Sequence, residues 1–351
     1  MNWPSYYDSG WNTPSQGPLT TGQRFRGFLE RLSLTWFQRC DGQTKITGVT
    51  ECLNRHYHGF PWRDANRLVV GSWGKSTEIR PPRDIDLLFI LPSWVYDRYE
   101  RISGNRQSRL LQEVKTILQR RFAATSLRGD GQVVVVPFSS YSVEVVPAFR
   151  LSDGKYAICD SHQGGRYKVI DPGAEVANIR WSDTWTSGDC RNLIRIIKRW
   201  QDYCKVPLKS FWIELLAVEF LETWDYVGKG PVYYDWMVRD FFSFLFNRSF
   251  LWLIMPGTWD PIYIGDNWKY KASIAYDHAS TACRYECLGM SWSAGQEWSK
   301  IFGPDILRED LWLQKVLNWP RNASGCRLPA WTRPSLFSSG SDFSDLSRWS
   351  S

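Results

Sequence analysis

The sequence predicts an α+β fold in which a core built on a mixed β-sheet is followed by an α-helical lobe. The first half of the chain contains the strand-like apolar runs, at residues 67–72, 84–91, 133–138 and 141–146. Beyond about residue 171 apolar residues instead recur at i, i+3 and i+4, the spacing of amphipathic helices. With 351 residues the chain is also long enough to form two lobes, each with its own core.

The composition of the two ends predicts how the chain is divided. Residues 1–21 are rich in Ser, Pro, Gly, Thr and Tyr without periodicity, and residues 332–351 are rich in Ser. Such segments bury too little apolar surface to fold, so we expect a flexible N-terminal segment and a disordered tail. The core is then expected over residues 22–175 and the helical lobe over residues 176–331.

The expected core elements follow one another from the N-terminus. Apolar residues at helical spacing predict a helix over residues 24–37 and a second from about 43 to 57. The strand at 84–91 ends in five consecutive apolar residues and is therefore expected to be buried on both faces. A helix over 106–122 precedes the last two strands, and the two serines between these strands indicate a hairpin.

The expected helical lobe contains at least four amphipathic segments, at residues 190–204, 210–224, 234–247 and 277–288. No internal repeat with a period of roughly 20 to 50 residues is present, which argues against a solenoid or propeller. The 21 tryptophans occur partly inside these helical patterns, so we expect them to pack in the core rather than to indicate a ligand.

Charge, cysteine usage and hydropathy exclude several classes of protein. The net charge of +7 suits a polyanionic partner, but a nucleoside triphosphate and an RNA would both satisfy it, so stable nucleic-acid binding stays open. Eight cysteines at irregular spacings, without a signal-peptide pattern, favour reduced thiols in the cytoplasm. No apolar run reaches the roughly 18 to 20 residues needed to span a bilayer, so no membrane partner is expected.

The segment after the first strand resembles a phosphate-binding loop in two ways. A Gly-Lys-Ser sequence at 74–76 matches the end of a Walker A motif, but that motif requires a glycine where this chain has Val69. The alternative is Gly71-Ser72. Gly71 would let the backbone approach a triphosphate closely, and the hydroxyl and N–H of Ser72 could donate hydrogen bonds to phosphate oxygens.

Three carboxylates form the expected metal site. Asp84 and Asp86 alternate along a strand, which places both on one face. Asp84 could instead cap a turn, with Asp86 a lone strand carboxylate. However, Asp86 begins a buried strand, where neighbouring ionised carboxylates are costly without a divalent cation. Glu144 is the single charge in a valine-rich run, and it is either a metal ligand or paired with Arg or Lys. We expect all three to hold Mg²⁺ or Mn²⁺ and to act in catalysis.

Together these residues resemble the polymerase-β-type nucleotidyltransferase superfamily and, within it, the CD-NTases. These are cyclic-oligonucleotide synthases of bacterial anti-phage defence, related to animal cyclic GMP-AMP synthase. The resemblance covers roughly residues 60–290, although the third carboxylate is commonly Asp in the family and is Glu144 here. It implies a nucleotidyltransferase core cradled by a helical lobe, with nucleotides bound in the cleft between them.

The resemblance also implies two residues that hold the donor triphosphate, a helix lysine matching Lys198 and a helix-start serine matching Ser210. From the residues alone, Lys198 could be a solvated helix lysine, and Ser210 could cap its helix with or without a phosphate contact. A zinc site like that of some animal relatives is not expected. His278, Cys283 and Cys287 would need a fourth ligand such as Cys326.

The implied activity uses two Mg²⁺ ions to join ribonucleoside triphosphates into a cyclic di- or oligonucleotide second messenger, with release of pyrophosphate. The implied partners are these substrates, an effector that senses the product, and an activating ligand or regulatory protein. Two alternatives stay open. One is an RNA-terminal or linear oligoadenylate-forming nucleotidyltransferase, and the other is a nucleotide-binding sensor without turnover.

Overall fold

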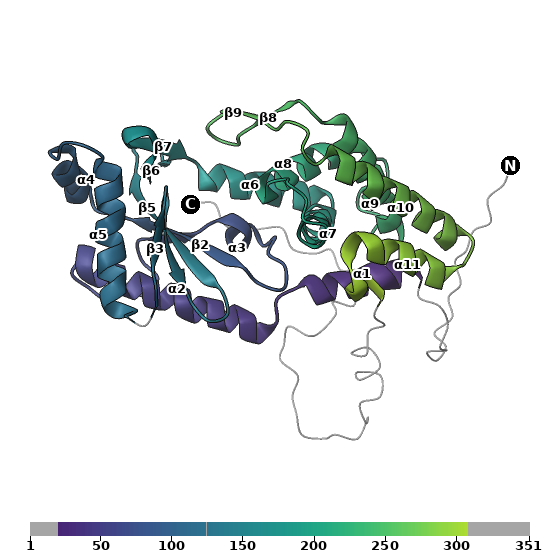
Figure 1. The fold of residues 1–351 in the computed structure, drawn as a ribbon, viewed down its shortest axis with the longest axis horizontal. Coiled ribbons are helices and arrows are strands. Elements are labelled where there is room, and N and C mark those ends of the chain that lie inside the picture. The colour runs from purple at the N-terminus through teal and green to yellow at the C-terminus, as the bar shows by residue number, and fades with distance from the viewer. Residues whose placement is uncertain (1–19, 124, 308–351) are drawn as a thin grey trace, which may run out of the picture. The chain divides into compact units, whose positions relative to one another are not determined.

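The computed structural model describes residues 20–123 and 125–307, and within them a sheet-based core and a helical lobe are evident (Figure 1). The α+β fold predicted from the sequence is confirmed. The expected tail at 332–351 and nearly all of the expected N-terminal segment lie outside these residues, as does Cys326. Among the described helices, none is both long and apolar enough to cross a membrane.

The core contains one mixed sheet. Its strands are β1 (Arg67–Val69), β2 (Asp84–Ile90), β3 (Arg128–Asp130), β4 (Val133–Pro137), β5 (Ser142–Arg150), β6 (Tyr156–Asp160) and β7 (Arg166–Ile170). The main path runs β1-β2-β5-β4-β3, and β6 joins β5 to β7. β2 and β5 are parallel, whereas the other neighbouring pairs are antiparallel. The predicted hairpin between β4 and β5 is confirmed.

Strand alternation gives β2 two chemically different faces. Ile85, Leu87 and Phe89 are fully buried against the helices that cover one side of the sheet, α2 (Trp36–Tyr57), α4 (Ser93–Glu100) and α5 (Arg106–Arg121). Asp84 and Asp86 point to the other side, followed by Leu88 in a small apolar cluster of its own. The helix-covered face thus anchors the strand, and the opposite face remains available for a site.

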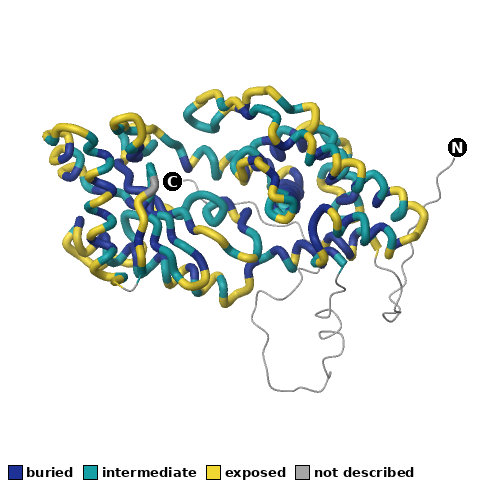
Figure 2. Tube along the Cα trace, viewed as in Figure 1, coloured by how far each residue is buried: buried dark blue, intermediate teal, exposed yellow. Residues whose placement is uncertain are grey.

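The helical lobe has a separate core, and buried positions run through both regions (Figure 2). Its helices are α6 (Pro172–Trp185), α7 (Asp189–Tyr203), α8 (Ser210–Leu221), α9 (Tyr234–Asn247), α10 (Lys269–Cys287) and α11 (Ser291–Phe302). A two-stranded sheet of β8 (Trp252–Ile254) and β9 (Pro261–Tyr263) lies between α9 and α10 in the chain. Short 3₁₀ segments occur at His162–Gly164, Pro231–Tyr233 and Pro304–Leu307.

The start of the described chain differs from the expectation. One helix was predicted over residues 24–37, but α1 (Thr21–Leu32) ends earlier and α2 begins at Trp36. The cause is a capping box at Thr35, whose side chain accepts from the backbone N–H of Gln38 while the Gln38 side chain bonds the Thr35 N–H. The apolar residues of α1 join the core of the helical lobe, although the segment falls within the range expected for the sheet core.

Candidate active site

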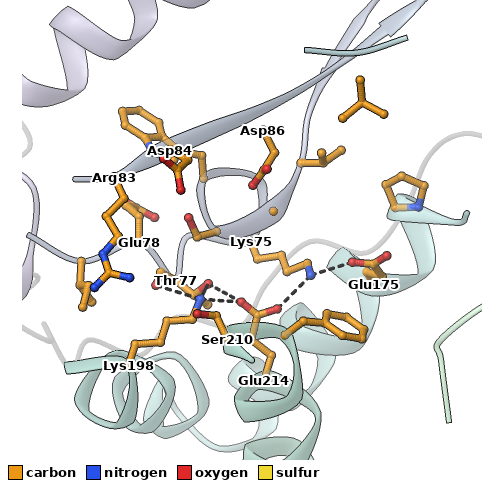
Figure 3. Close-up of a pocket in the computed structure, with 18 of the residues that line it drawn as sticks. Lys75, Thr77, Glu78, Arg83, Asp84, Asp86, Glu175, Lys198, Ser210 and Glu214 are labelled. Carbon is orange, nitrogen blue, oxygen red and sulfur yellow. Dashed lines mark hydrogen bonds and ion pairs between the residues drawn. The ribbon is translucent and has the colours of Figure 1, made fainter. Parts of the chain in front are cut away.

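A cavity of about 550 Å³ lies between the sheet core and the helical lobe (Figure 3). The walls come from β2, the first turn of α6, helices α7 and α8, and α3 (Gly71–Lys75), a short helix that follows β1. Six of the seven residues expected from the sequence line it, namely Gly71, Ser72, Asp84, Asp86, Lys198 and Ser210. Side chains far apart in the sequence are therefore gathered around one space.

Asp84 and Asp86 form the acidic wall of the cavity. Asp84 is exposed at the rim and accepts a hydrogen bond of 3.0 Å from the Ser142 hydroxyl. Asp86 lies deeper, where burial and then the neighbouring charge of Asp84 raise its pKa, with partial relief from Lys75. Burial is the larger cause and the like charge of Asp84 adds to it, so both make the ionised form of Asp86 unfavourable here.

Gly71 has a structural role in addition to the one expected for it. Its φ of +58° lies in the left-handed region, and a Cβ atom at this position would lie 1.7 Å from Oδ2 of Asp86. The preceding Val70 N–H donates to the Asp86 carbonyl at 2.9 Å. Any side chain at position 71 would therefore collide with the Asp86 carboxylate, so the glycine allows α3 to start directly beside it.

Glu144 lies beside Asp86 by strand register but is not among the residues that line the cavity. β2 and β5 pair so that Asp84 lies opposite Ser142 and Asp86 opposite Glu144, which places the carboxylates on the same face of the sheet. Across the residues that the structure describes, no three His, Cys, Asp or Glu side chains are gathered closely enough to hold a metal ion. Asp84 and Asp86 suit a divalent cation because their oxygens are hard ligands in a site with uncompensated negative charge. The contribution of Glu144 stays a prediction.

Lys198 is not a solvated helix lysine. It is buried on α7, and its ammonium lies 2.6 Å from Oε1 of Glu214 and 2.9 Å from the Thr77 hydroxyl. Burial lowers the pKa of Lys198, and the adjacent Glu214 charge opposes that shift. The lysine therefore reaches the cavity wall with a carboxylate already bound to it.

Lys75 and two glutamates complete this side of the cavity, and the sequence reasoning did not identify them. Nζ of Lys75 lies 2.7 Å from Glu175 of α6 and 2.9 Å from Glu214 of α8. The same ammonium lies 4.8 Å from the centre of the Phe211 ring. Figure 3 shows Glu214 between the two lysines, so that it links α3, α7 and α8 across the floor of the cavity.

Comparison with known proteins agrees with this arrangement. Residues 19–182 match the family model described as Second Messenger Oligonucleotide or Dinucleotide Synthetase domain. A probable cyclic nucleotide synthase of Bacillus cereus (strain VD146) is 24% identical over 293 residues, spanning 70% of this chain and 84% of that protein. Residues 19–182 therefore carry the domain of the CD-NTases, a family of nucleotidyltransferases. The structural neighbours are consistent with this assignment.

Two solved structures show the same fold as this chain. E. coli MS115-1 CdnC with ATP has a TM-score of 0.61 at 18% identity, over 82% of this chain and 99% of that one. Vibrio cholerae DncV, a cyclic AMP-GMP synthase with the linear intermediate 5′ pppA(3′,5′)pG, has a TM-score of 0.66 at 13% identity. That match spans 84% of this chain and 98% of DncV. The low identities mean that the likeness concerns the fold, and individual residues must be argued from their own contacts.

Ser210 occupies the first position of α8, and it does not cap the helix. The N-cap is Lys209, and the structure shows no side-chain capping bond there. The Ser210 hydroxyl instead donates to Oε1 of Gln201 at 3.0 Å, on the exposed edge of the cavity. The capping alternative for Ser210 is therefore wrong, and the hydroxyl is held at the edge of the cavity.

Two signals in the sequence could have located two of the three missed residues, Glu214 and Lys75. Glu214 is the single charge in a long apolar run on α8, the same kind of signal that drew attention to Glu144. Lys75 belongs to the Gly-Lys-Ser sequence that failed the Walker A spacing. The failed motif excluded one fold but said nothing against a phosphate-binding role for the lysine within another fold.

Proposed function

We propose that this CD-NTase joins ribonucleoside triphosphates into a cyclic di- or oligonucleotide second messenger in the cytoplasm. In each transfer a ribose hydroxyl oxygen of one nucleotide attacks the α-phosphorus of another. The α–β phosphoanhydride bond breaks, pyrophosphate leaves and the hydroxyl proton is lost. The observation that carries the proposal is the Asp84–Asp86 pair, which faces a cavity of nucleotide size from the uncovered side of β2.

The proposed metal ligands are Asp84, Asp86 and Glu144, with Mg²⁺ or Mn²⁺ as the cation. A bound divalent cation would supply Lewis-acid stabilisation of the phosphate charge and a lower pKa for the attacking hydroxyl. Asp84 and Asp86 lie on a strand whose other face is buried in the core. The strand therefore holds the two carboxylates in position before the substrate binds. Glu144 would join them from the neighbouring strand.

We assign the triphosphate to the opposite side of the cavity. The proposed contacts are Ser72 and backbone groups at Gly71 on α3, Lys198 on α7 and Ser210 on α8, all of which line the cavity. Lysine ammonium groups and hydroxyls suit phosphate oxygens because the hydrogen bonds are charge-assisted. We also propose that an effector reads the product in anti-phage signalling, and that a ligand or regulatory protein activates synthesis.

The test is incubation of the full-length protein with labelled ribonucleoside triphosphates and Mg²⁺ or Mn²⁺, then alkaline phosphatase and mass spectrometry. We expect a phosphatase-resistant cyclic product from the wild type. The Asp84→Ala/Asp86→Ala protein should lose at least about a thousandfold in rate, since the electrostatic stabilisation of the transition state is removed. Asp153→Ala, which neutralises an exposed aspartate in a distant turn, is the matched control.

Three outcomes would contradict the proposal in different ways. Product from the double variant at the wild-type rate would remove the carboxylates from the mechanism. A product that the phosphatase degrades completely, or a strict requirement for RNA, would favour the linear or RNA-terminal alternative. Nucleotide binding without pyrophosphate release under any activator would favour the sensor.

A further inference from the structure

We infer that Lys75 binds the donor triphosphate and that Glu175 is its resting counter-ion, which the triphosphate displaces. The inference rests on the proposed function, because it assigns a substrate contact within the same cavity. It concerns two residues that the resemblance to the family did not point to. The supporting evidence is the position of Lys75, the number of acceptors around each lysine, and the difference between the two glutamates.

The first observation is where the Lys75 side chain lies. Lys75 ends α3, the helix that begins at Gly71 beside the Asp86 carboxylate, and it lines the same cavity as Ser72 and Asp86. Figure 3 shows its side chain running from α3 toward Glu175 and Glu214. A triphosphate that reaches from the metal-binding carboxylates toward α8 would therefore pass the Lys75 ammonium.

The second observation is that the two lysines differ in how completely their donors are used. A lysine ammonium has three N–H donors. Lys198 meets three oxygen acceptors, Glu214 at 2.6 Å, the Thr77 hydroxyl at 2.9 Å and the Thr77 carbonyl at 3.4 Å. Lys75 meets two oxygen acceptors, and the Phe211 ring lies 4.8 Å away. Lys75 is thus the lysine that can donate a hydrogen bond to a phosphate oxygen with the smaller rearrangement.

The third observation is that the two glutamates differ in how firmly they are held. The Glu214 side chain is 5% exposed and is shared by Lys75, Lys198 and the Thr77 hydroxyl. The Glu175 side chain is 16% exposed, and within the described residues it forms one ion pair, with Lys75. Displacing Glu175 breaks one ion pair and returns a partly exposed carboxylate to water. Displacing Glu214 would break two buried ion pairs and would leave the Thr77 hydroxyl without the oxygen to which it donates.

Charge balance gives a reason for the exchange. In the structure two lysines meet two glutamates, so this side of the cavity carries no net charge from the four groups. Phosphate oxygens that replace Glu175 supply the anion that the buried ammonium requires, so Lys75 stays compensated throughout. Glu175 then competes with substrate for Lys75, which predicts tighter nucleotide binding when its charge is removed.

The experiment measures equilibrium binding of α,β-methylene-ATP with Mg²⁺ to the full-length protein, together with KM and kcat for ATP. We expect Glu175→Gln to lower Kd and KM about three- to tenfold while kcat is unchanged, since a competing anion is removed. Lys75→Met keeps the apolar stem and should raise Kd about ten- to a hundredfold through loss of a charge-assisted hydrogen bond. Glu51→Gln, which neutralises an ion-paired glutamate on α2, should leave Kd unchanged.

A double-mutant cycle shows whether Glu175 acts through Lys75. In the Lys75→Met background, Glu175→Gln should have no effect on Kd, because the competition no longer exists. The inference is overturned if Glu175→Gln leaves Kd unchanged or raises it in the otherwise wild-type protein. Should Lys75→Met fail to fold, Glu175→Gln alone decides.

The two proposals fail differently. Tighter binding by Glu175→Gln without any cyclic product would refute the proposed function and keep the phosphate contact. Cyclic product without tighter binding would refute this inference alone. A wild-type protein that binds no nucleotide in the presence of Mg²⁺ would overturn both.

Discussion

The two sides of the active-site cavity handle buried carboxylates in opposite ways. On the sheet side Asp86 lies next to Asp84, and burial together with that like charge raises the pKa of Asp86. On the helical side burial alone would raise the pKa of Glu214, but the charges of Lys198 and Lys75 outweigh it and hold the pKa below its usual value. The helical side is thus compensated by the protein itself, whereas on the sheet side the proposed cation would supply the compensation. Removing one negative charge should therefore have opposite effects on the two sides.

The largest expected effect is on the compensated side. Glu214→Gln leaves Lys75 with one carboxylate and Lys198 with none, both still buried. Breaking a buried ion pair from one partner costs about 3 to 5 kcal/mol, so we expect the free energy of unfolding to fall by about 3 kcal/mol. Urea denaturation of the two proteins, without nucleotide or metal, measures the difference.

The control for this prediction is Glu51→Gln, where an ion pair at the surface is removed and a change below about 1 kcal/mol is expected. If Glu214→Gln were as stable as the wild type, the two lysines would not depend on Glu214 for their charge balance. The contrast between the two sides of the cavity would then have no energetic basis.

Asp235 provides a third setting, a buried carboxyl away from the cavity that forms no ion pair with a lysine among the residues the structure describes. It lies on α9, and burial raises its pKa to about 7, with Glu286 adding to the shift. The unfolded chain has the ordinary value of 3.8, so between these values only the folded state holds the proton. The stability from this group is therefore present at low pH and lost as pH rises through about 7.

We expect the free energy of unfolding to fall by about 3 kcal/mol between pH 5 and pH 8, because a slope of about 1.4 kcal/mol per pH unit extends over about two units, up to the folded pKa of about 7. Asp235→Asn should remove most of this slope. Asp240→Asn on the same helix is the control, because Asp240 is half-exposed and already paired with Arg239. A wild-type slope that persists in Asp235→Asn would assign the pH dependence to another group.

The sequence predicted the sheet side of this comparison better than the helical side. Asp84 and Asp86 share a face because of strand alternation, which two neighbouring positions are enough to define. The buried strand that follows and the close approach of Gly71 are also encoded within a few residues. The pairing of Lys75 with Glu214 joins positions 139 residues apart on different helices, and only the packing of the two lobes brings them together.

Other differences also follow from whether an interaction is local. The prediction of one helix over residues 24–37 missed the Thr35 capping box, although the two residues that form it lie within four positions of the chain. The family resemblance implied that Lys198 binds the donor triphosphate, and the structure shows that this residue lines the cavity, but its ion pair with Glu214 was not expected. Strands β3, β6 and β7 are short or carry polar residues, so their hydrogen bonding to neighbours, rather than an apolar pattern, determines them.

The last prediction tests the sheet side and reverses the sign of the first. Asp86→Asn removes a charge that burial and Asp84 disfavour, so we expect the metal-free protein to become more stable by about 1 kcal/mol. Saturating Mg²⁺ should stabilise the wild type, because a cation that binds only the folded state shifts the unfolding equilibrium. The same Mg²⁺ should leave Asp86→Asn nearly unchanged. Thermal unfolding of both proteins with and without Mg²⁺, next to Asp153→Asn as a surface control, gives the four values needed.

Destabilisation of metal-free Asp86→Asn to the same extent as Glu214→Gln would mean that the charge of Asp86 is already compensated within the protein. In that case neighbouring protein groups would compensate the charges on both sides of the cavity, and charge balance would no longer favour a cation at Asp84 and Asp86.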